Sequence, residues 1–280
     1  MKVVTLRILV VLLGSLISRC DAQSLSIMTL NVRFASRDDG ANLWEKRRDQ
    51  LVAAIREKSP DLLGTQELLH LQGEFIAARL PEYTWFGLGR RGDRTDEHMG
   101  VFFRKDRLRA LETGNFWLSE TPEAAGSSSW NMSLPRMVTW GLFEFADTGR
   151  RLYFFNTHFP HRGTEDAAAR LACARVLAER LARLPKDVPV ILTGDFNTDA
   201  GTEPYRLLTS TLTDAWTAAE RRTGPEKTFH GFRGVPSLAR IDWVLYRGPF
   251  RALAAETIDR NEGGRYPSDH FPIWVRLELK

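Results

Sequence analysis

Nine acidic, amide and imidazole side chains along the chain are of the types that hold divalent cations and move protons. They are Asn31, Glu67, Glu97, His158, Asp195, Asn197, Asp242, Asp269 and His270. Most of them lie at the end of, or just inside, a short apolar run of the kind that forms a strand. Because strand ends at one edge of a sheet can meet in one cleft, we expect these side chains to share a site.

Gathering several carboxylates in one cleft is unfavourable without a cation, because like charges repel and burial raises the cost further. Magnesium suits the set: it takes hard oxygen ligands from one or two carboxylates, with water and a substrate phosphate completing the octahedron. Mn²⁺ is the alternative ion. Zinc would more often come with closely spaced Cys or His ligands, and the sequence has no such spacing. The set therefore predicts a Mg²⁺ site.

The reaction that such a site favours is hydrolysis of a phosphate ester, in which water attacks phosphorus in line with the leaving oxygen. A metal held by Glu67 with help from Asn31 would neutralise the anion and stabilise the leaving oxygen. Asp195 could take the proton of the water. An imidazole paired with a carboxylate could face the phosphate as a cation.

The elements that must position these groups can be predicted from hydrophobic periodicity and breakers. Helices are expected over residues 43–59, 69–80 and 204–208, and a further helix begins at 164–166 and ends before Pro185. Asn42 with Glu45 three residues later predicts a cap for the first helix. The apolar stripe of the helix from 164–166 should face the core, while its arginines, including Arg170, should stay in solvent.

Strands are expected to outnumber the helices. Their predicted ranges are 25–30, 61–67, 83–89, 99–104, 107–118, 137–145, 151–159, 188–196, 239–247, 250–258 and 271–279. Helices interleaved with so many strands predict an α/β (α+β) fold, a four-layer sandwich of two mixed β-sheets packed face to face with helices on the outside.

Seven segments carry most of these residues in order across the chain: TLNVRF, GTQE, EHMGVFFR, NTHF, TGDFN, RIDWVL and SDHFP. Together they resemble the motifs of the endonuclease/exonuclease/phosphatase superfamily, metal-dependent phosphoesterases that include deoxyribonuclease I-like enzymes. The segments NFWLSETP and NTHFPHRG further resemble an exported bacterial branch of it. The resemblance implies the same four-layer fold and a metal-dependent phosphoric ester hydrolase.

The resemblance also implies a role for each matching residue near the metal. Glu67 would be the principal metal ligand, with Asn31 and Asp269 close to the ion. Asp195 would align or deprotonate the water, and Asn197 would hold that water or a phosphate oxygen.

On the phosphate side, the resemblance implies that His270 contacts the phosphate and is oriented by Asp242. It implies that His158 does the same from the opposite side, with Glu97 as its orienting partner. Glu97 lies in the charged loop GRRGDRTDEH, where one of two neighbouring aspartates could take its place.

Two further residues are candidates for substrate binding or support. Arg136 begins a predicted strand, and its guanidinium fork suits a phosphate. His161 lies in the loop after His158, where it could contact the substrate. Close relatives often carry a polar residue at the position of Pro160, so this departure leaves the role of His161 open.

Each acid also has a structural interpretation when it is taken singly, as a turn, a strand edge or a helix start. Asn31 could close a turn, and Asn197 could cap a helix, beside any functional role. The tripeptide Ser268, Asp269, His270 could suggest part of a serine triad. However, the sequence has no G-x-S-x-G motif, and Ser268 is too close to His270 to be its nucleophile.

The N-terminus predicts export. Lys2 and Arg7 precede the apolar stretch 8–17, and Ala22 is the small residue that a signal peptidase needs. Residues 1–22 therefore read as a signal peptide, too short in its apolar part for a membrane anchor. The expected mature protein is a single catalytic domain over residues 23–280, secreted or periplasmic. It is expected to be a monomer, with Cys173 as its one cysteine and no internal disulfide.

The charge balance bears on the substrate. Loss of the three basic residues and one acidic residue in the first 22 positions lowers the net charge from +4 to +2. A balanced surface gives little attraction for nucleic acid, so a phosphorylated small molecule or a phospholipid head group is the first expectation. A secreted endonuclease or exonuclease on DNA or RNA is the alternative. A non-catalytic binding module is the third hypothesis, disfavoured because no member of the residue set is missing.

Overall fold

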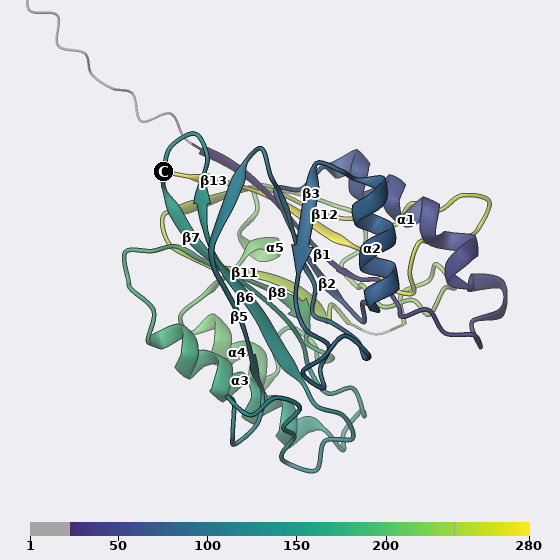
Figure 1. Ribbon diagram of the computed structural model, residues 1–280, viewed down its shortest axis with the longest axis horizontal. Helices are drawn as coiled ribbons and strands as arrows, with labels where there is room; N and C mark the ends of the chain where they lie inside the picture. Colours follow the sequence, from purple (N-terminus) through teal and green to yellow (C-terminus); the bar gives the residue numbers. More distant parts are fainter. Residues whose placement is uncertain (1–22, 238) are drawn as a thin grey trace, which may run out of the picture.

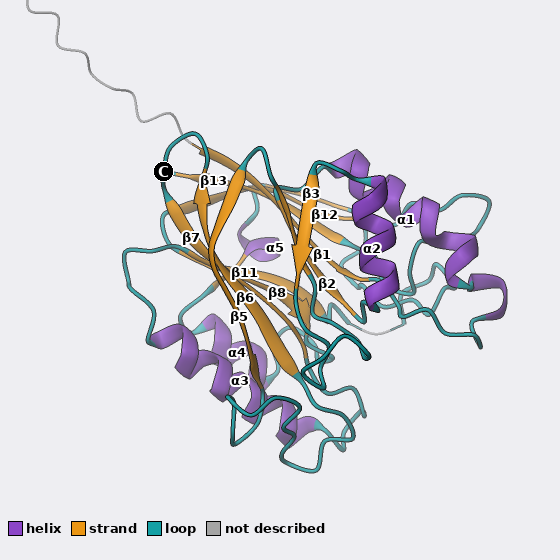
Figure 2. Cartoon of the chain, viewed as in Figure 1, coloured by secondary structure: helices purple, strands orange, loops and turns teal. Residues whose placement is uncertain are grey.

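Two mixed β-sheets of seven and six strands form the centre of the protein in a computed structural model that describes residues 23–237 and 239–280. The sheets pack face to face, and helices lie on both outer sides (Figure 1 and Figure 2). This arrangement confirms the predicted four-layer α/β sandwich. The predicted signal peptide, residues 1–22, lies outside the described residues.

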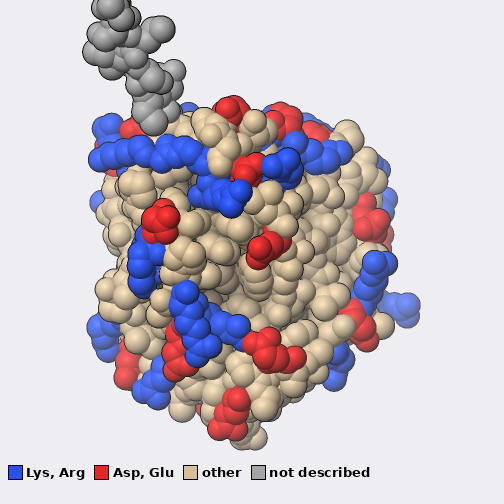
Figure 3. Space-filling view, turned by 60° about the vertical axis from the view of Figure 1, so that its left-hand side comes forward, with Lys and Arg blue, Asp and Glu red and all other residues tan. Residues whose placement is uncertain are grey.

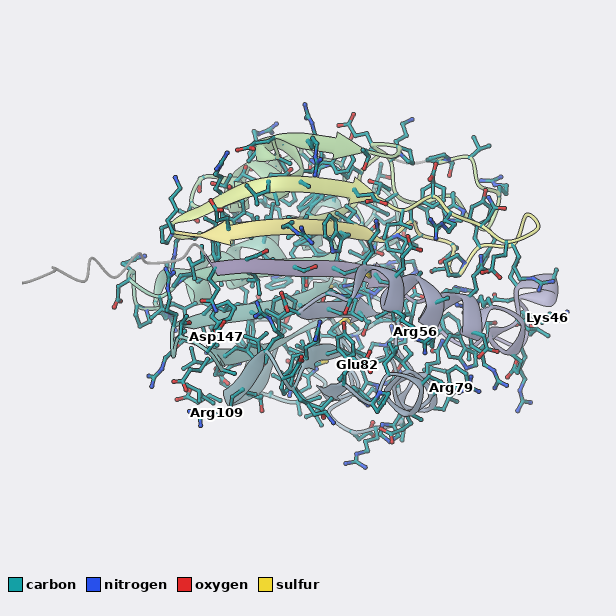
Figure 4. The ribbon with its side chains drawn as sticks, turned by 90° about the horizontal axis from the view of Figure 1, so that it is seen from above. Lys46, Arg56, Arg79, Glu82, Arg109 and Asp147 are labelled. Carbon is teal, nitrogen blue, oxygen red and sulfur yellow. The ribbon has the colours of Figure 1, made fainter. Side chains whose placement is uncertain are left out.

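The seven-stranded sheet contains the first and the last strand of the described part, and its strands run in mixed directions. Its strands, in spatial order, are β10 (Arg221–Thr223), β12 (Phe250–Thr257), β13 (Ile273–Leu279), β1 (Gln23–Asn31), β2 (Leu62–Gln66), β4 (Val101–Arg104) and β3 (Tyr83–Phe86). Figure 4 shows β1 lying beside β13, with β12 on the far side of β13. The parallel pair β1 and β2 carries its carboxyl ends to the same edge.

The six-stranded sheet lies against it. Its strands, in spatial order, are β5 (Leu108–Trp117), β6 (Met137–Phe145), β7 (Arg151–His158), β8 (Val190–Asp195), β11 (Asp242–Arg247) and β9 (Thr213–Asp214). The sequence predicted all of these except the two-residue β9, and it also missed the short β10 of the other sheet. Both are too short to show a periodicity.

In the part of the chain that the structure describes, four helices cover the outer faces: α1 (Trp44–Lys58), α2 (His70–Arg79), α3 (Ala167–Ala182) and α4 (Glu203–Thr209). The single-turn α5 (Ala215–Ala218) contacts β11 and β12, one strand of each sheet, and packs into the core between the sheets. One apolar cluster packs α1 and α2 against β1, and a second packs α3 and α4 against β7, β8 and β11. The third cluster fills the space between the two sheets. Burial of the apolar side chains in these three clusters holds the strand ends in place.

Two local predictions were wrong. Residues Gly40–Asn42 form a 3₁₀ turn, so the residue before α1 is Leu43, and it makes no side-chain cap. Arg170 is buried rather than solvated, because its guanidinium donates to the carbonyl oxygens of Pro160 (3.1 Å) and Gly163 (2.5 Å). It thus holds the loop that follows β7 against α3.

A buried amide joins the two sheets directly behind the predicted site. Asn156 on β7 donates through Nδ2 to the carbonyl oxygens of Thr65 (2.7 Å) and Gly100 (3.0 Å). Its Oδ1 accepts from Gln66 Nε2 (2.7 Å) and Thr193 Oγ1 (3.1 Å). All hydrogen-bonding capacity of this amide is therefore used. Asn156 fixes the end of β2, and hence the following Glu67, relative to the opposite sheet.

The sheets approach closely at this point because β2 carries a glycine there. A Cβ on Gly64 would lie 2.2 Å from Thr193 Oγ1 and 2.6 Å from Asn156 Oδ1. No side chain fits at that distance, so the amide of Asn156 can reach the backbone of the other sheet directly.

Replacing Asn156 with aspartate should destabilise the protein by about 3 to 5 kcal/mol, because two buried donors become an acceptor that faces two carbonyl oxygens. Urea unfolding measures the loss. The matched control is Thr193→Val, which removes one donor to the same amide and should cost about 1 kcal/mol. Equal effects of the two substitutions would contradict the central role of Asn156.

On the face that Figure 3 displays, acidic and basic side chains are intermixed, so no large area of it carries charge of one sign. Several form surface pairs, such as Arg79 with Asp49 (2.9 Å) and Arg109 with Glu144 (2.5 Å), and Arg79 and Arg109 lie at the periphery of Figure 4.

Cys173 is buried and free. Within residues 23–237 and 239–280, none of the helices has the length and apolarity needed to span a bilayer.

Candidate active site

A cavity of about 500 Å³ opens where strand ends of both sheets meet. The residues that line it are Arg33, Phe34, Glu67, Arg90, Glu97, Leu134, Arg136, His158, His161, Asp195, Asn197, Phe229, Ile241, Asp269 and His270. Nine of the eleven residues that the sequence singled out are among them. The other two, Asn31 and Asp242, are buried directly behind the wall and contact residues that line it.

Strand register places the residues of the six-stranded sheet in one row. His158 ends β7 and Asp195 ends β8, and the two are register partners in this parallel pair. Asp242 begins the antiparallel strand β11 and is the partner of Asp195. Register alone therefore brings an imidazole and two carboxylates together across three adjacent strands.

The predicted pairing of His270 with Asp242 is confirmed. Its Nδ1 lies 2.9 Å from Asp242 Oδ2, and its Nε2 lies 3.7 Å from Asp195 Oδ2. Burial alone would lower the pKa of His270, but the negative charges of Asp242 and Asp195 outweigh it and raise the pKa well above 6.5. His270 is therefore held as an imidazolium cation at neutral pH.

His158 is held in the opposite state. Its Nε2 lies 3.5 Å from Asp195 Oδ2. Burial and then the nearby charge of Arg136 lower its pKa well below 6.5, so this ring is neutral. The two imidazoles beside Asp195 thus differ in charge, one suited to donate to an anion and the other to remain uncharged.

Glu97 does not pair with His158, so that prediction was wrong. The Glu97 carboxylate accepts from Arg90 Nη1 at 2.9 Å, and His158 Nδ1 has no hydrogen-bond partner among the described residues. The two aspartates of the same loop do not replace Glu97: Asp96 pairs with Arg90 and Arg91, and Asp93 accepts from Thr95. Sequence position could not reveal that an arginine in the same loop competes for the carboxylate.

The carboxylates of Glu67 and Asp269 lie on the side of the seven-stranded sheet. Asn31 Nδ2 donates to Glu67 Oε1 (3.0 Å) and to Asp195 Oδ2 (3.0 Å), so one amide ties the two sides of the cavity together. Burial raises the pKa of Asp269, and Glu67 adds to this although His270 acts against it. These hard oxygen atoms are close enough to repel each other.

The backbone around these groups is strained. Glu67 (φ 57°), Asn197 (φ 50°) and Arg33 (φ 54°) all have left-handed conformations without being glycine. Each such residue costs of the order of 1 kcal/mol and persists only where the surroundings impose it. Three such residues around one cavity indicate that the fold imposes their backbone conformations, which direct their side chains at a cost in folding stability.

Asp195 is oriented from two sides. It accepts from Asn31 Nδ2 through Oδ2 and from the Asn197 backbone N–H through Oδ1 at 2.9 Å. Asn197 itself donates through Nδ2 to the Phe159 carbonyl oxygen at 3.0 Å, which joins the loops after β7 and β8. Burial, then repulsion by Asp242, raises the pKa of Asp195 to about 7. A carboxylate with this pKa can accept a proton at neutral pH.

Ser268 has a supporting role, as its closeness to His270 suggested. Its hydroxyl donates to the Asn31 carbonyl oxygen at 2.5 Å and lies 3.2 Å from Asp269 Oδ1. It therefore fastens the loop that carries Asp269 and His270 to the end of β1.

Some residues of the site were missed by the sequence analysis. Arg47 on α1 is fully buried and donates to the carbonyl oxygens of Val32 (2.6 Å), Arg33 (2.6 Å) and Pro267 (2.9 Å), which clamps the loops after β1 and before β13. Its position on a surface-type helix hid this role. Arg90 lies in the charged loop GRRGDRTDEH and was not singled out, although the acidic residues of that loop could have indicated partners for it.

Among the described residues, Asp195, Asp242 and His270 also form a group that could hold a metal ion, because one ligand atom from each lies within 4.8 Å of the other two. In the geometry observed, however, His270 Nδ1 and Asp242 are already engaged with each other. The cavity therefore offers two possible sets of ligand atoms: Glu67 with Asn31 and Asp269, and Asp195 with Asp242 and His270.

Comparison with known proteins agrees with this geometry. Residues 28–270 match the Endonuclease/Exonuclease/phosphatase family. A family protein from Bacteroides thetaiotaomicron superposes with a TM-score of 0.87 at 32% identity, over 92% of this chain and 99% of that one. The mannosyl-6-phosphatase of the same organism gives 0.83 at 33% identity, over 90% and 99%. In sequence, nocturnin of Xenopus laevis is 26% identical over 256 residues, and the match covers 82% of this chain but 63% of nocturnin.

Proposed function

The chain belongs to the endonuclease/exonuclease/phosphatase family, and from this premise we propose that it hydrolyses a phosphate ester of a small molecule with a divalent cation and an activated water. The observation that carries the proposal is the arrangement of Asp195 between a cationic His270 and a neutral His158 in one cavity. It supplies a proton acceptor and a fixed positive charge at the same place.

We place the cation at Glu67, with Asn31 and Asp269 beside it, and we propose Mg²⁺, with Mn²⁺ as the alternative. The chemistry of these donors fits: they are hard oxygen ligands, and the pKa of Asp269 is raised by burial and by Glu67, which is the repulsion that a cation would relieve. When bound, the ion would neutralise the phosphate and stabilise the leaving oxygen. The single cysteine of the described part, Cys173, is not in the cavity, which gives no support for a thiolate-bound metal.

The side chains of Asp195, His270 and His158 then have separate roles. Asp195, aimed by Asn31 and the Asn197 backbone, takes the proton of the attacking water. His270, fixed by Asp242 and charged, donates to a phosphate oxygen. Neutral His158 lies on the other side of Asp195 and donates from whichever ring nitrogen carries the proton.

A phosphorylated small molecule, such as a sugar phosphate, is the proposed substrate. The likeness to the mannosyl-6-phosphatase supports this class, as do the limited cavity and the mixed surface charge. Nucleic acid would be expected to need a larger basic face. Turnover of plasmid DNA that falls steeply with salt would favour a nuclease instead, because phosphate contacts are screened.

We also propose that the protein is exported to the periplasm or beyond, after cleavage following Ala22. The support is the sequence pattern of residues 1–22 alone. N-terminal sequencing of the protein from the periplasmic and extracellular fractions tests it, and an intact Met1 in the cytoplasm would contradict it.

The mature protein with Mg²⁺ should hydrolyse at least one member of a panel made of p-nitrophenyl phosphate, bis-p-nitrophenyl phosphate, plasmid DNA and single-stranded RNA. A chelator should abolish the turnover, and Mg²⁺ or Mn²⁺ should restore it, because the carboxylates of Glu67 and Asp269 cannot bind the anion by themselves. Glu67→Gln should raise the Mg²⁺ concentration needed for half-maximal rate about tenfold or more. Activity that resists chelation would remove the metal from the proposal.

A further inference from the structure

Three arginines line the cavity, and they differ in how their charges are compensated. Arg33 pairs with Asp39 at 2.8 Å. Arg90 pairs with Asp96 at 3.0 Å and with Glu97 at 2.9 Å. Arg136 is different: among the described residues no carboxylate oxygen lies within 4.0 Å of its guanidinium, although the residue is only 3% exposed.

A buried cation without a partner is costly, and such a charge is usually neutralised by a bound anion or removed. The Arg136 Nε and Nη1 atoms are shielded from solvent and make no hydrogen bond to protein atoms. Glu97, Glu67 and Asp195 act on this guanidinium only from beyond 4.0 Å. Glu97 is the strongest of these three charges, but its carboxylate already accepts from Arg90 at 2.9 Å and makes no hydrogen bond to Arg136.

The remaining nitrogen of Arg136 is fixed by His161, a residue exposed at the edge of the cavity. Arg136 Nη2 lies 2.9 Å from His161 Nδ1. A guanidinium can only donate, so Nδ1 accepts, and the neutral ring carries its proton on Nε2. The pair therefore has one net positive charge, held in place, beside His158 and Asn197 on the cavity wall.

We propose that the uncompensated charge of Arg136, held by His161, selects a terminal phosphate, a dianionic phosphomonoester, over a monoanionic phosphodiester. A monoester brings one more negative charge and one more free oxygen than a diester of the same leaving group. The cation placed at Glu67 already faces the single negative charge of a diester. Arg136 supplies the extra positive charge that the second negative charge of a monoester requires.

This inference rests on the proposed function, and its test separates the two. Mature enzyme with Mg²⁺ is assayed at pH 8 on p-nitrophenyl phosphate and on methyl p-nitrophenyl phosphate, which share a leaving group. Arg136→Gln should lower kcat/KM for the monoester by about 10- to 100-fold and for the diester by less than about threefold. The matched control, Arg175→Gln on the exposed face of α3, should change neither value.

Binding provides a readout that needs no turnover. Inorganic phosphate should raise the Tm of the wild-type protein with Mg²⁺ more than dimethyl phosphate does, and Arg136→Gln should lose that difference. Without phosphate, Arg136→Gln should have a Tm equal to or above that of the wild type, since an uncompensated buried charge is gone. Should Arg136→Gln fail to fold, Arg136→Met, which fills a similar volume without polar atoms, replaces it in both measurements.

His161→Phe separates charge from hydrogen bonding. It removes the acceptor but keeps the guanidinium, so the ratio of monoester to diester kcat/KM should stay within about threefold of the wild-type ratio. Equal losses on both esters in Arg136→Gln, or phosphate protection that survives it, would overturn the selection. If the wild type hydrolyses neither ester, the proposed function fails, while the binding measurement still decides the role of Arg136.

Discussion

Asp195→Asn is expected to lower kcat by about 100- to 10,000-fold, the range that loss of a general base commands. Asparagine keeps the shape of the side chain, but its single oxygen can accept from only one of the two donors, Asn31 Nδ2 and the Asn197 backbone N–H, and it cannot take a proton from water. KM should change little, because the phosphate is held by other groups. Steady-state kinetics on whichever substrate the panel identifies measures the effect.

The same substitution is predicted to lower activity but to raise the stability of the metal-free protein relative to the wild type as the pH rises. The pKa of Asp195 is raised from 3.8 to about 7 by burial and by Asp242, so the folded protein holds a proton that the unfolded chain has released. The wild type therefore loses stability as pH rises from 3.8 towards 7. Without metal, the Tm of Asp195→Asn relative to that of the wild type should therefore rise over that interval.

Asp199→Asn, at an exposed position four residues along the chain, is the matched control and should leave both kcat and Tm unchanged. Two results would count against the role of Asp195. One is turnover close to that of the wild type. The other is a Tm of the metal-free Asp195→Asn protein that does not rise relative to that of the wild type between pH 3.8 and 7, which would mean that the pKa of Asp195 is not raised by its surroundings.

The fold was largely predictable because its strands are long apolar runs ended by polar residues. The segment that ends in Asp195 and the one that begins with Asp242 could be placed as strands from the sequence. Their register could not, since pairing depends on burial of one sheet face against the other sheet and of the opposite face against helices. Strands as short as β9 and β10 pair because their neighbours are already in place.

The sequence predicted which residues belong to the site but not every contact that they make. The pairing of His270 with Asp242 followed from the family resemblance, and the structure has it. Glu97 shows the limit: the sequence places it near the site, but its partner depends on where Arg90 in the same loop directs its guanidinium. The role of Arg47 could not be predicted, because a helix pattern cannot distinguish a solvated arginine from a buried one that donates to several backbone carbonyl groups.

Asp242→Asn should have a comparably large effect, although Asp242 lies behind the cavity wall and would touch no substrate. An asparagine cannot stabilise the imidazolium of His270, and its amide can donate to Nδ1 and hold the ring in the wrong tautomer. We expect kcat to fall by about 100-fold or more, by analogy with the loss when an orienting carboxylate is removed from an imidazole.

The pH profile distinguishes this explanation from simple disruption. Asp242 and Asp195 raise the pKa of His270, and activity that needs the cation declines as pH rises through that pKa. Asp242→Asn lowers the pKa, so the alkaline limb of log kcat should move to lower pH, while a merely distorted site would lose rate equally at all pH values.

The double substitution Asp242→Asn with His270→Gln tests whether Asp242 acts through His270 alone. If Asp242 acts only through His270, the double variant should be no slower than His270→Gln alone, because the carboxylate has nothing left to hold. Multiplied losses would show instead that Asp242 contributes through Asp195, its register partner, whose pKa it also raises. The single contact of 2.9 Å between Asp242 and His270 favours the first result, since it is the direct hydrogen bond that the aspartate makes in the site.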